Sequence, residues 1–369
     1  DRMGMMRKCI VVSAVNIIEG GTLTVLRDCL ASAALSLPSE WEIIALVHDQ
    51  KLVDQPRVRF IEIPDAKRSW LRRLYHEWID FRRLSRELEP DLWLSLHDIT
   101  PRVITRRQAV YCHNPSPFYQ LPLREAWLEP KLWLFNNFYQ YLYRAFIRRN
   151  QCVIVQQGWL RVVFEKMYGK LPIGVAHPSV TSPSHSKYPK AAFGKVVFFY
   201  PALPRVFKNF EVICEAAKIL SSRGVSGFEI RMTLSGRENS YSKWLYKKYA
   251  NVFGVLFIGL QNKIQMGNHY HEASAVLFPS RLETWGLPIS EAKLYKKPQL
   301  VADLPYAHET VGSYNHVSFF HPADAAELAN LMQSIIENNW HPEGAKMDEP
   351  SKPFTRNWDE LWRLLSDGL

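Results

Sequence analysis

Short apolar segments alternate with amphipathic segments along most of the chain, and this alternation limits the possible folds more than any other feature. In the first half the apolar segments are predicted strands, at Cys9–Val15, Glu42–His48, Val58–Ile63, Leu92–Leu96, Gln108–Tyr111 and Cys152–Val155. Helices are predicted between them, at Thr22–Leu35, Lys67–Arg86 and Leu128–Arg149. Strands that alternate with helices form parallel sheets covered on both faces. The pattern therefore predicts an α/β fold.

A second series of strands and helices follows residues 178–189, which are rich in Pro, Ser, Thr, His and Lys, as a linker is. Its predicted strands are Val196–Tyr200, Glu229–Leu234, Val255–Ile258 and Ala275–Phe278, and its predicted helices are Asn209–Arg223, Met266–Glu272 and Pro288–Tyr295. We expect two doubly wound, Rossmann-like domains, 1–188 and 189–353, and a terminal amphipathic helix over 354–369. Ligands bind at the carboxyl ends of such strands, so two facing domains would enclose a cleft.

Composition excludes several classes of protein. The five cysteines are scattered and form no C-x-x-C pair, which argues against a disulfide framework and a zinc site. No apolar run reaches the ~18 residues of a membrane span, and the N-terminus lacks the pattern of a signal peptide, so we expect a cytoplasmic protein. Neither Asp-x-Asp nor a G-x-S-x-G elbow occurs, so we expect no metal–diphosphate site of that type and no serine hydrolase.

The net charge of +10 lies mostly in the first 188 residues, and much of it is in Lys67–Arg86. Apolar side chains recur there at helical spacing, at Leu71, Leu74, Trp78, Phe81 and Leu84. A basic amphipathic helix of this kind either lies on an anionic membrane surface or packs on the core with a solvated basic face. Nucleic acid is not an expected partner, because no binding motif accompanies the charge.

The segment 277–291 carries the strongest functional signal. An apolar strand is followed by Glu283, a Gly-Leu-Pro turn at Gly286 and Leu287, and Glu291 in the helix that begins there. The backbone N–H groups and positive dipole end of such a helix favour an anion, such as a diphosphate. The two carboxylates, one before the turn and one after it, can accept hydrogen bonds from hydroxyl groups on either side of that diphosphate.

Three other segments supply candidate residues. A Gly20-Gly21 turn links the first strand to the first helix and permits close approach of a ligand to the backbone. After the strand Val196–Tyr200 come Arg205 and Lys208, whose side chains can bind phosphate. His113 follows another strand, where a neutral imidazole can donate or accept a hydrogen bond, and the adjacent pair His97 and Asp98 is a competing candidate.

These segments resemble retaining glycosyltransferases of the GT-B fold, family 4, which belong to glycosyltransferase group 1. The resemblance covers nearly the whole chain and is strongest from Val196 to Pro298. It implies donor contacts from the following residues: Gly20, Gly21, Arg205, Lys208, Thr284, Trp285, Gly286, Leu287 and Glu291. It implies catalytic roles for His113 and Glu283. The family usually has an arginine, after a glycine, at the position that Leu203 occupies here, so Arg205 is displaced from that position.

The activity implied is transfer of a hexose or deoxyhexose from a nucleotide-diphospho-sugar to a saccharide hydroxyl with retention of configuration, in bacterial polysaccharide or lipopolysaccharide assembly. The resemblance implies no metal or other cofactor, and a saccharide or lipid-linked glycan as acceptor. The basic first half adds a possible anionic membrane surface as a partner. The alternatives are a nucleotide-sugar epimerase or phosphorylase of related fold, and a non-catalytic nucleotide-sugar-binding protein.

Overall fold

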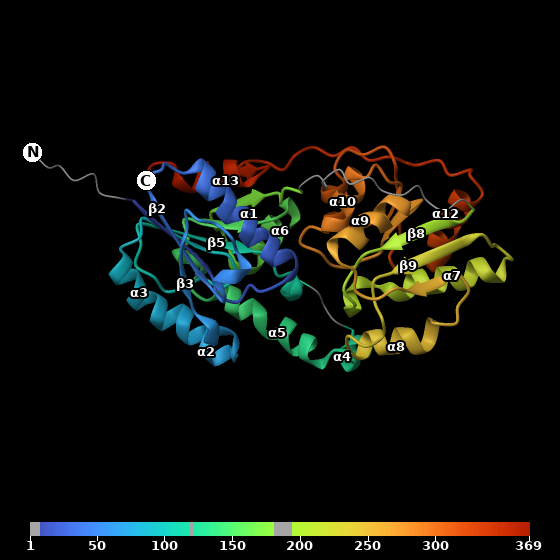
Figure 1. The fold of residues 1–369 in the computed structure, drawn as a ribbon, viewed down its shortest axis with the longest axis horizontal. Helices are drawn as coiled ribbons and strands as arrows, with labels where there is room; N and C mark the ends of the chain where they lie inside the picture. Colours follow the sequence, from blue (N-terminus) through green and yellow to red (C-terminus); the bar gives the residue numbers. More distant parts are fainter. Residues whose placement is uncertain (1–7, 119–121, 181–193) are drawn as a thin grey trace, which may run out of the picture. The chain divides into compact units, whose positions relative to one another are not determined.

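The computed structural model describes residues 8–118, 122–180 and 194–369, and the chain divides into two compact units (Figure 1). The first unit comprises Asp1–Pro117, Asn137–Ser179 and Pro350–Leu369, and the second comprises Phe118–Asn136 and Val180–Glu349. The predicted boundary at residues 188 and 189, with most of the predicted linker, lies outside the described residues. Residues 118–136, which we placed in the first domain, group with the second unit.

The first unit contains one parallel sheet in the order β14-β7-β6-β5-β4-β1-β2-β3. Its strands are β1 (Cys9–Ala14), β2 (Glu42–Val47), β3 (Arg59–Glu62), β4 (Leu92–Ser95), β5 (Arg107–Cys112), β6 (Cys152–Val155), β7 (Ile173–Ala176) and β14 (Phe354–Thr355). All six predicted strands are present, whereas β7 and β14 were not predicted. Alternate residues of β1 enter two different core clusters, as expected where helices cover both faces of a sheet.

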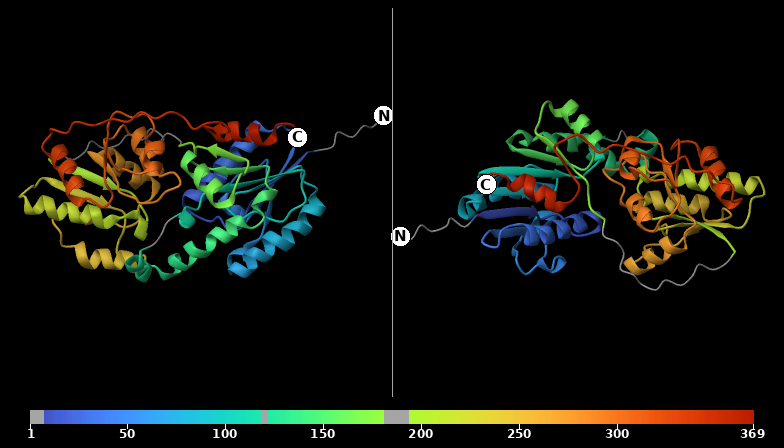
Figure 2. Two further views of the ribbon diagram at one scale, coloured as in Figure 1. Left: turned by 180° about the vertical axis from the view of Figure 1, so that it is seen from behind. Right: turned by 90° about the horizontal axis from the view of Figure 1, so that it is seen from above.

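The helices of the first unit include the predicted ones with altered ends, and a further helix over Gly158–Tyr168 that was not predicted. They are α1 (Gly20–Ser36), α2 (Trp70–Tyr75), a π-helical turn (His76–Asp80), α3 (Phe81–Leu88), most of α5 (Pro130–Arg144), α6 (Gly158–Tyr168) and α13 (Trp358–Ser366). The long aromatic helix predicted over Leu128–Arg149 ends at Arg144. Helices α13 and α1 lie side by side (Figures 1 and 2), and the Trp362 indole donates to the Cys29 carbonyl at 3.0 Å.

The predicted apolar face of the basic segment Lys67–Arg86 is only partly correct. Phe81 is buried and Leu74, Trp78 and Leu84 are partly buried, but Leu71 is 82% exposed. The π-helical turn between α2 and α3 interrupts the 3.6-residue period, so the two ends of the segment do not share one face. Within the described ranges, no helix has the length and apolar composition needed to cross a bilayer.

The second unit contains a six-stranded parallel sheet in the order β10-β9-β8-β11-β12-β13. Its strands are β8 (Val196–Tyr200), β9 (Phe228–Met232), β10 (Val255–Phe257), β11 (Ala275–Phe278), β12 (Gln299–Ala302) and β13 (Val317–Phe320). Its helices are α4 (Leu123–Leu128), α7 (Phe210–Ser222), α8 (Ser240–Tyr249), α9 (Lys263–Glu272), α10 (Leu287–Leu294), α11 (Pro305–Val311) and α12 (Ala325–Ile336). Elements β12, β13, α4, α8, α11 and α12 were not predicted.

Each sheet reverses its strand order at one point. In the first unit the reversal lies between β1 and β4, and in the second it lies between β8 and β11. Ligands of doubly wound sheets bind outside the carboxyl ends of the strands at such reversal points. The loops that follow these four strands contain most of the candidate residues, and His113 follows β5, the neighbour of β4.

Candidate functional site

The turn between β11 and α10 in the second unit requires glycine at Gly286. Its φ of +87° is left-handed, and a Cβ there would lie 3.1 Å from Cε1 of Phe278. Helix α10 begins at the next residue, Leu287, with proline in its first turn and no side-chain cap. The first N–H groups of a helix have no partner within the helix, so this end can receive an anion.

Lys208 and Glu283 form an ion pair that joins the loops after β8 and β11. Their side chains are only 19% and 12% exposed. The backbone supports the same junction, because Arg281 N–H donates to the Phe207 carbonyl at 2.8 Å and the Asn209 amide donates to the Pro279 carbonyl at 3.0 Å. The structure therefore brings together two residues that the sequence separates by 75 positions.

Arg205 lies on the same loop but is held by a different carboxylate. Its Nη1 is 3.2 Å from Oε1 of Glu129, and the neighbouring Val206 N–H donates to Oε2 of Glu129 at 3.0 Å. Glu129 comes from residues 118–136, immediately after α4, and is almost fully buried. Arg205 is 46% exposed and pairs with Glu129, whereas the Lys208 ammonium pairs with Glu283.

Arg281 is an arginine of this site that sequence reasoning missed. Its Nη2 is 2.8 Å from Glu211 and donates to Asn209 at 2.9 Å, and its Nη1 pairs with Glu125. It stands two positions before Glu283, inside the segment that carried the strongest signal. That position was the only clue in the sequence, because Glu125, Asn209 and Glu211 lie at least 70 positions away along the chain.

Glu291 lies in α10 and accepts a hydrogen bond from the hydroxyl of Tyr270 in α9 at 2.5 Å. Burial raises the pKa of Glu291 above its ordinary value. The Tyr270 ring in turn stacks on Tyr295 at 5.0 Å between centroids. Glu291 is therefore a carboxylate in a largely apolar setting, with a tyrosine hydroxyl as its side-chain donor.

The remaining candidates of this turn are placed by packing. The Trp285 indole is buried and donates to the Ser290 hydroxyl at 3.0 Å, so the ring stabilises the turn. Thr284 is partly buried, and Leu287 is the first residue of α10. Together with Gly286 these residues set the path of the backbone before the helix.

Gly20 and Gly21 lie at the start of α1 in the first unit and are both exposed. Gly20 has a left-handed φ of +70°, and a Cβ there would meet no atom within 4 Å. Glu19 precedes α1 without a side-chain hydrogen bond to it. The first helix of this unit therefore begins as α10 does, with a positive-φ glycine and no side-chain cap.

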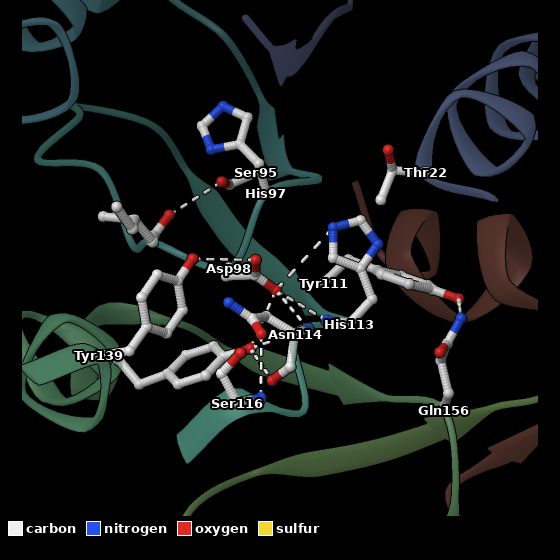
Figure 3. A network of polar contacts seen from close by, with 12 residues as sticks. Thr22, Ser95, His97, Asp98, Tyr111, His113, Asn114, Ser116, Tyr139 and Gln156 are labelled. Carbon is white, nitrogen blue, oxygen red and sulfur yellow. Dashed lines mark hydrogen bonds and ion pairs between the residues drawn. The ribbon is translucent and has the colours of Figure 1, made fainter. Parts of the chain in front are cut away.

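His113 lies beside Asp98 in the same unit (Figure 3). Its Nε2 is 3.9 Å from Oδ1 of Asp98, its side chain is 8% exposed, and its ring meets that of Tyr111 edge to face at 5.8 Å. Burial lowers the pKa of His113, so the imidazole is neutral at pH 7. A neutral imidazole can donate or accept a hydrogen bond.

The two competing candidates, His97 and Asp98, lie in different environments. His97 is buried, with Nδ1 at 3.0 Å from Glu77 and at 3.3 Å from Arg73. Asp98 faces the opposite loop and contacts the backbone of His113 and Asn114. Among the residues that the structure describes, no group of three or more His, Cys, Asp or Glu side chains could hold a metal ion.

Comparison with known proteins supports the resemblance drawn from these residues. Residues 182–352 match the family model described as glycosyl transferases group 1. The sucrose-phosphate synthase from Thermosynechococcus elongatus has a similar fold, with a TM-score of 0.67 at 15% identity over 90% of each chain. The lipopolysaccharide outer core galactosyltransferase WaaB, in its apo form, gives 0.59 at 14% identity over 91% of this chain and 92% of that chain.

Anabaena HepE in complex with UDP-glucose is similar too, with a TM-score of 0.60 at 14% identity over 89% of this chain and 90% of that chain. A search of curated protein sequences finds no match. At these identities the solved structures establish a shared fold. The predicted α/β fold with two doubly wound parallel sheets is confirmed.

Proposed function

We propose that this chain, whose residues 182–352 match the group 1 glycosyltransferase model and whose fold is similar to that of solved glycosyltransferases, is itself such an enzyme. It would move a hexose or deoxyhexose from a nucleotide-diphospho-sugar to a saccharide hydroxyl with retention of configuration. One observation carries the proposal. The Lys208–Glu283 pair lies where the second sheet reverses its strand order, and it joins the loop after β8 to the loop that leads into α10. A cation, a carboxylate and an uncapped helix start match the phosphates and hydroxyls of such a donor.

We assign each part of the nucleotide sugar to residues of suitable charge. Lys208 and the backbone N–H groups from Trp285 to Leu287 stabilise the negative charge that builds on the leaving diphosphate. Release of Lys208 to the phosphates frees Glu283 to accept hydrogen bonds from the sugar hydroxyls. Glu291 receives the ribose hydroxyls. Because the ammonium and the helix dipole supply positive charge, we expect turnover without added divalent metal ion.

The chemical step that the resemblance implies takes place on one face of the sugar. The bond between the anomeric carbon and the phosphate oxygen breaks, the acceptor oxygen bonds to that carbon, and the acceptor proton passes to the leaving phosphate. We assign to His113 a hydrogen bond to a hydroxyl of the reacting sugar, and to the Gly20-Gly21 backbone a contact with substrate. The neutral state of His113 suits this role, because it neither repels nor neutralises a developing positive charge on the sugar.

A screen of nucleotide sugars by thermal shift tests the donor, because a ligand that binds only the folded protein raises its Tm. The best donor is then supplied in labelled form with saccharide acceptors. Label in an extended saccharide supports the proposal, whereas free sugar phosphate indicates a phosphorylase and an isomerised donor indicates an epimerase. Binding without any product indicates a non-catalytic binding protein. Turnover abolished by EDTA and restored by manganese would contradict the metal-independent mechanism.

An exposed stripe on α2 and the following π-helical turn supports an anionic membrane surface as a partner. Leu71, Tyr75 and Ile79 recur every four residues and are 82%, 45% and 55% exposed. Exposed arginines flank the stripe, at positions Arg68, Arg72, Arg83 and Arg86. Apolar side chains between cations are typical of helices that lie on anionic lipid. The acceptor that fits such a location is a lipid-linked glycan, as used in bacterial polysaccharide or lipopolysaccharide assembly.

Flotation with liposomes tests this surface. We expect the protein to float with vesicles that contain an anionic phospholipid at low salt and to be released at high salt. The Leu71→Ser, Tyr75→Ser, Ile79→Ser triple variant should lose flotation, while Leu260→Ser with Ile264→Ser, which changes exposed apolar residues of the second unit, should keep it. Equal flotation of both variants would contradict the assignment.

A further inference from the structure

Asp98 adopts a backbone conformation that costs energy. Its φ of +73° is left-handed, a region that disfavours residues with a Cβ by about 1–2 kcal/mol, although aspartate tolerates it better than most. The residue is 6% exposed and directly follows the two residues after β4. Such a conformation persists where several surrounding contacts hold the residue in place, and it is frequent at functional sites.

The surroundings of Asp98 consist of four donors from two elements (Figure 3). The backbone N–H groups of His113 and Asn114 donate to Oδ1 at 2.7 and 3.1 Å. The hydroxyls of Tyr143 and Tyr139, both on α5, lie 3.0 Å from Oδ1 and Oδ2. A carboxylate offers about four acceptor positions, so these donors occupy its capacity and leave it poorly suited to act as a base.

The same contacts determine where His113 points. Oδ1 of Asp98 holds the N–H of His113 itself, which fixes the peptide plane from which the imidazole projects. The imidazole Nε2 then lies 3.9 Å from that oxygen, and the ring meets the Tyr111 ring edge to face. Further stability of the turn comes from Asn114, whose side-chain oxygen accepts the Ser116 N–H at 3.0 Å.

We propose that Asp98 is a positioning residue for His113. Its carboxylate holds the turn at His113 and Asn114, places a negative charge next to the imidazole, and is itself held by Tyr139 and Tyr143. This inference rests on the proposed function, in which His113 bonds to the reacting sugar. It assigns to the competing candidate Asp98 a role that acts through His113, without contact to substrate.

The charge of Asp98 gives the proposal a signature in pH dependence. Burial lowers the pKa of His113, the negative charge of Asp98 opposes that effect, and His97 and Arg73 lower the pKa further. Tyr111, Tyr139, Tyr143 and Cys112 also titrate nearby, and burial raises their pKa values, so they are neutral at pH 7. Removal of the Asp98 charge therefore lowers the pKa of His113. Since activity requires the neutral ring, the acid limb of the pH profile moves to lower pH.

Two variants of Asp98 separate its geometry from its charge. Asp98→Ala removes both. We expect kcat to fall about 10²-fold, because the His113 imidazole is then misplaced, while the KM for the donor stays unchanged. Asp98→Asn keeps an oxygen for the two N–H donors, and Tyr139 can accept from the new amide. We expect it to restore most of kcat while the acid limb stays at lower pH. Loss of kcat at every pH without that movement would overturn the proposal.

A readout without turnover distinguishes failure of this proposal from failure of the proposed function. The His113 imidazole is followed by NMR in protein labelled with ¹⁵N-histidine, and its signal is identified by its loss in His113→Gln. Its titration midpoint should be lower in Asp98→Asn than in wild type, even if no donor yields product. An unchanged midpoint overturns the proposal whatever the activity.

Control variants protect the test from effects on folding. Asp65→Asn removes the charge of a carboxylate that pairs with His76 at 2.9 Å, and it should leave the His113 midpoint and kcat unchanged. If Asp98→Ala does not fold, Tyr139→Phe with Tyr143→Phe removes two of the four donors and retains both rings. This double variant should lower kcat more than the KM for the donor, and an unchanged kcat would contradict the positioning role.

Discussion

The candidate sites of the two units are built alike but satisfy their polar groups in opposite ways. Each lies at a reversal of strand order and includes a helix, α1 or α10, that starts at or just after a positive-φ glycine without a side-chain cap. In the first unit the carboxylate of Asp98 is surrounded by uncharged donors. In the second unit the three cations of the candidate site, Lys208, Arg205 and Arg281, each face a carboxylate.

This difference suggests different behaviour when a substrate binds. A buried carboxylate with four neutral donors keeps its partners, because any exchange would leave a buried group unsatisfied. A cation held by a carboxylate can change partners, because the phosphates of an incoming diphosphate replace the carboxylate as acceptors of its hydrogen bonds. We therefore expect the first unit to offer a fixed geometry and the second unit to exchange ion pairs for ligand contacts.

The largest effect is expected from Lys208→Met, which removes the cation proposed to bind the donor diphosphate. We expect kcat/KM for the donor to fall about 10³-fold, because the positive charge that stabilises the leaving diphosphate is lost. Glu283 also loses its charged partner, so the free energy of unfolding should fall. Steady-state kinetics and calorimetry with nucleoside diphosphate measure both effects. Lys218→Met, which removes an exposed cation paired with Glu215 on α7, should change neither.

Gly286→Ala tests the turn that leads into α10. Its left-handed backbone costs about 1–2 kcal/mol with a Cβ, and crowding against Phe278 adds about 1–3 kcal/mol. We expect urea unfolding to show a loss of about 3 kcal/mol. Gly224→Ala is the matched control, because its φ is +71° and a Cβ there meets nothing within 4 Å. Equal losses in the two variants would mean that Phe278 adds nothing.

Glu291→Gln tests a carboxylate of the second unit that has no cation partner among the described residues. Loss of charged hydrogen bonds to ribose should weaken donor binding by about 2 kcal/mol, roughly 30-fold, in calorimetry. Burial raises the folded pKa of Glu291 above the unfolded value of about 4.3, so wild-type stability falls as pH rises from that value through the folded pKa. The stability of the glutamine variant relative to wild type should therefore increase from pH 4 to pH 7. Unchanged affinity would refute the ribose assignment.

Glu129→Gln should have the smallest effect. The amide oxygen can still accept the Val206 N–H, but the negative charge beside Arg205 is lost. Because Arg205 is nearly half exposed, the ion pair is worth at most about 1 kcal/mol, and donor affinity should rise no more than about fivefold. Calorimetry at low and high salt would check this. Weaker donor binding would show that Glu129 holds Arg205 in a productive position.

Much of the fold could be predicted from residue patterns, and the reasons are local. The strands that were found, such as Cys152–Val155 and Ala275–Phe278, are apolar runs bounded by polar residues. The unpredicted β7 contains Gly174 and has only four residues, and β14 has two, so neither shows a period. The π-helical turn at His76–Asp80 left no clear signal either, so the interruption of the helical period and the exposure of Leu71 were not predicted.

The residues of the candidate site also fall into two groups, those that one segment could predict and those that depend on distant partners. Glu283, Gly286 and Glu291 could be named from one segment, since their spacing around a turn is a local property. Arg281, Tyr270 and Asp98 gained their roles only from partners far along the chain, such as Glu125, Glu291 and Tyr143. No pattern within a single segment indicates such partners.

The order of residues by itself determined two series of buried parallel strands, the loops at their carboxyl ends, and a glycine turn that opens a helix. It also placed a lysine after one strand and a glutamate after another. Only the tertiary structure decided that β8 lies beside β11, so that Lys208 meets Glu283, and that α5 brings two tyrosines to Asp98. The reason is physical: strand neighbours and the partners of buried polar groups are selected by packing over the whole unit, which no local period records.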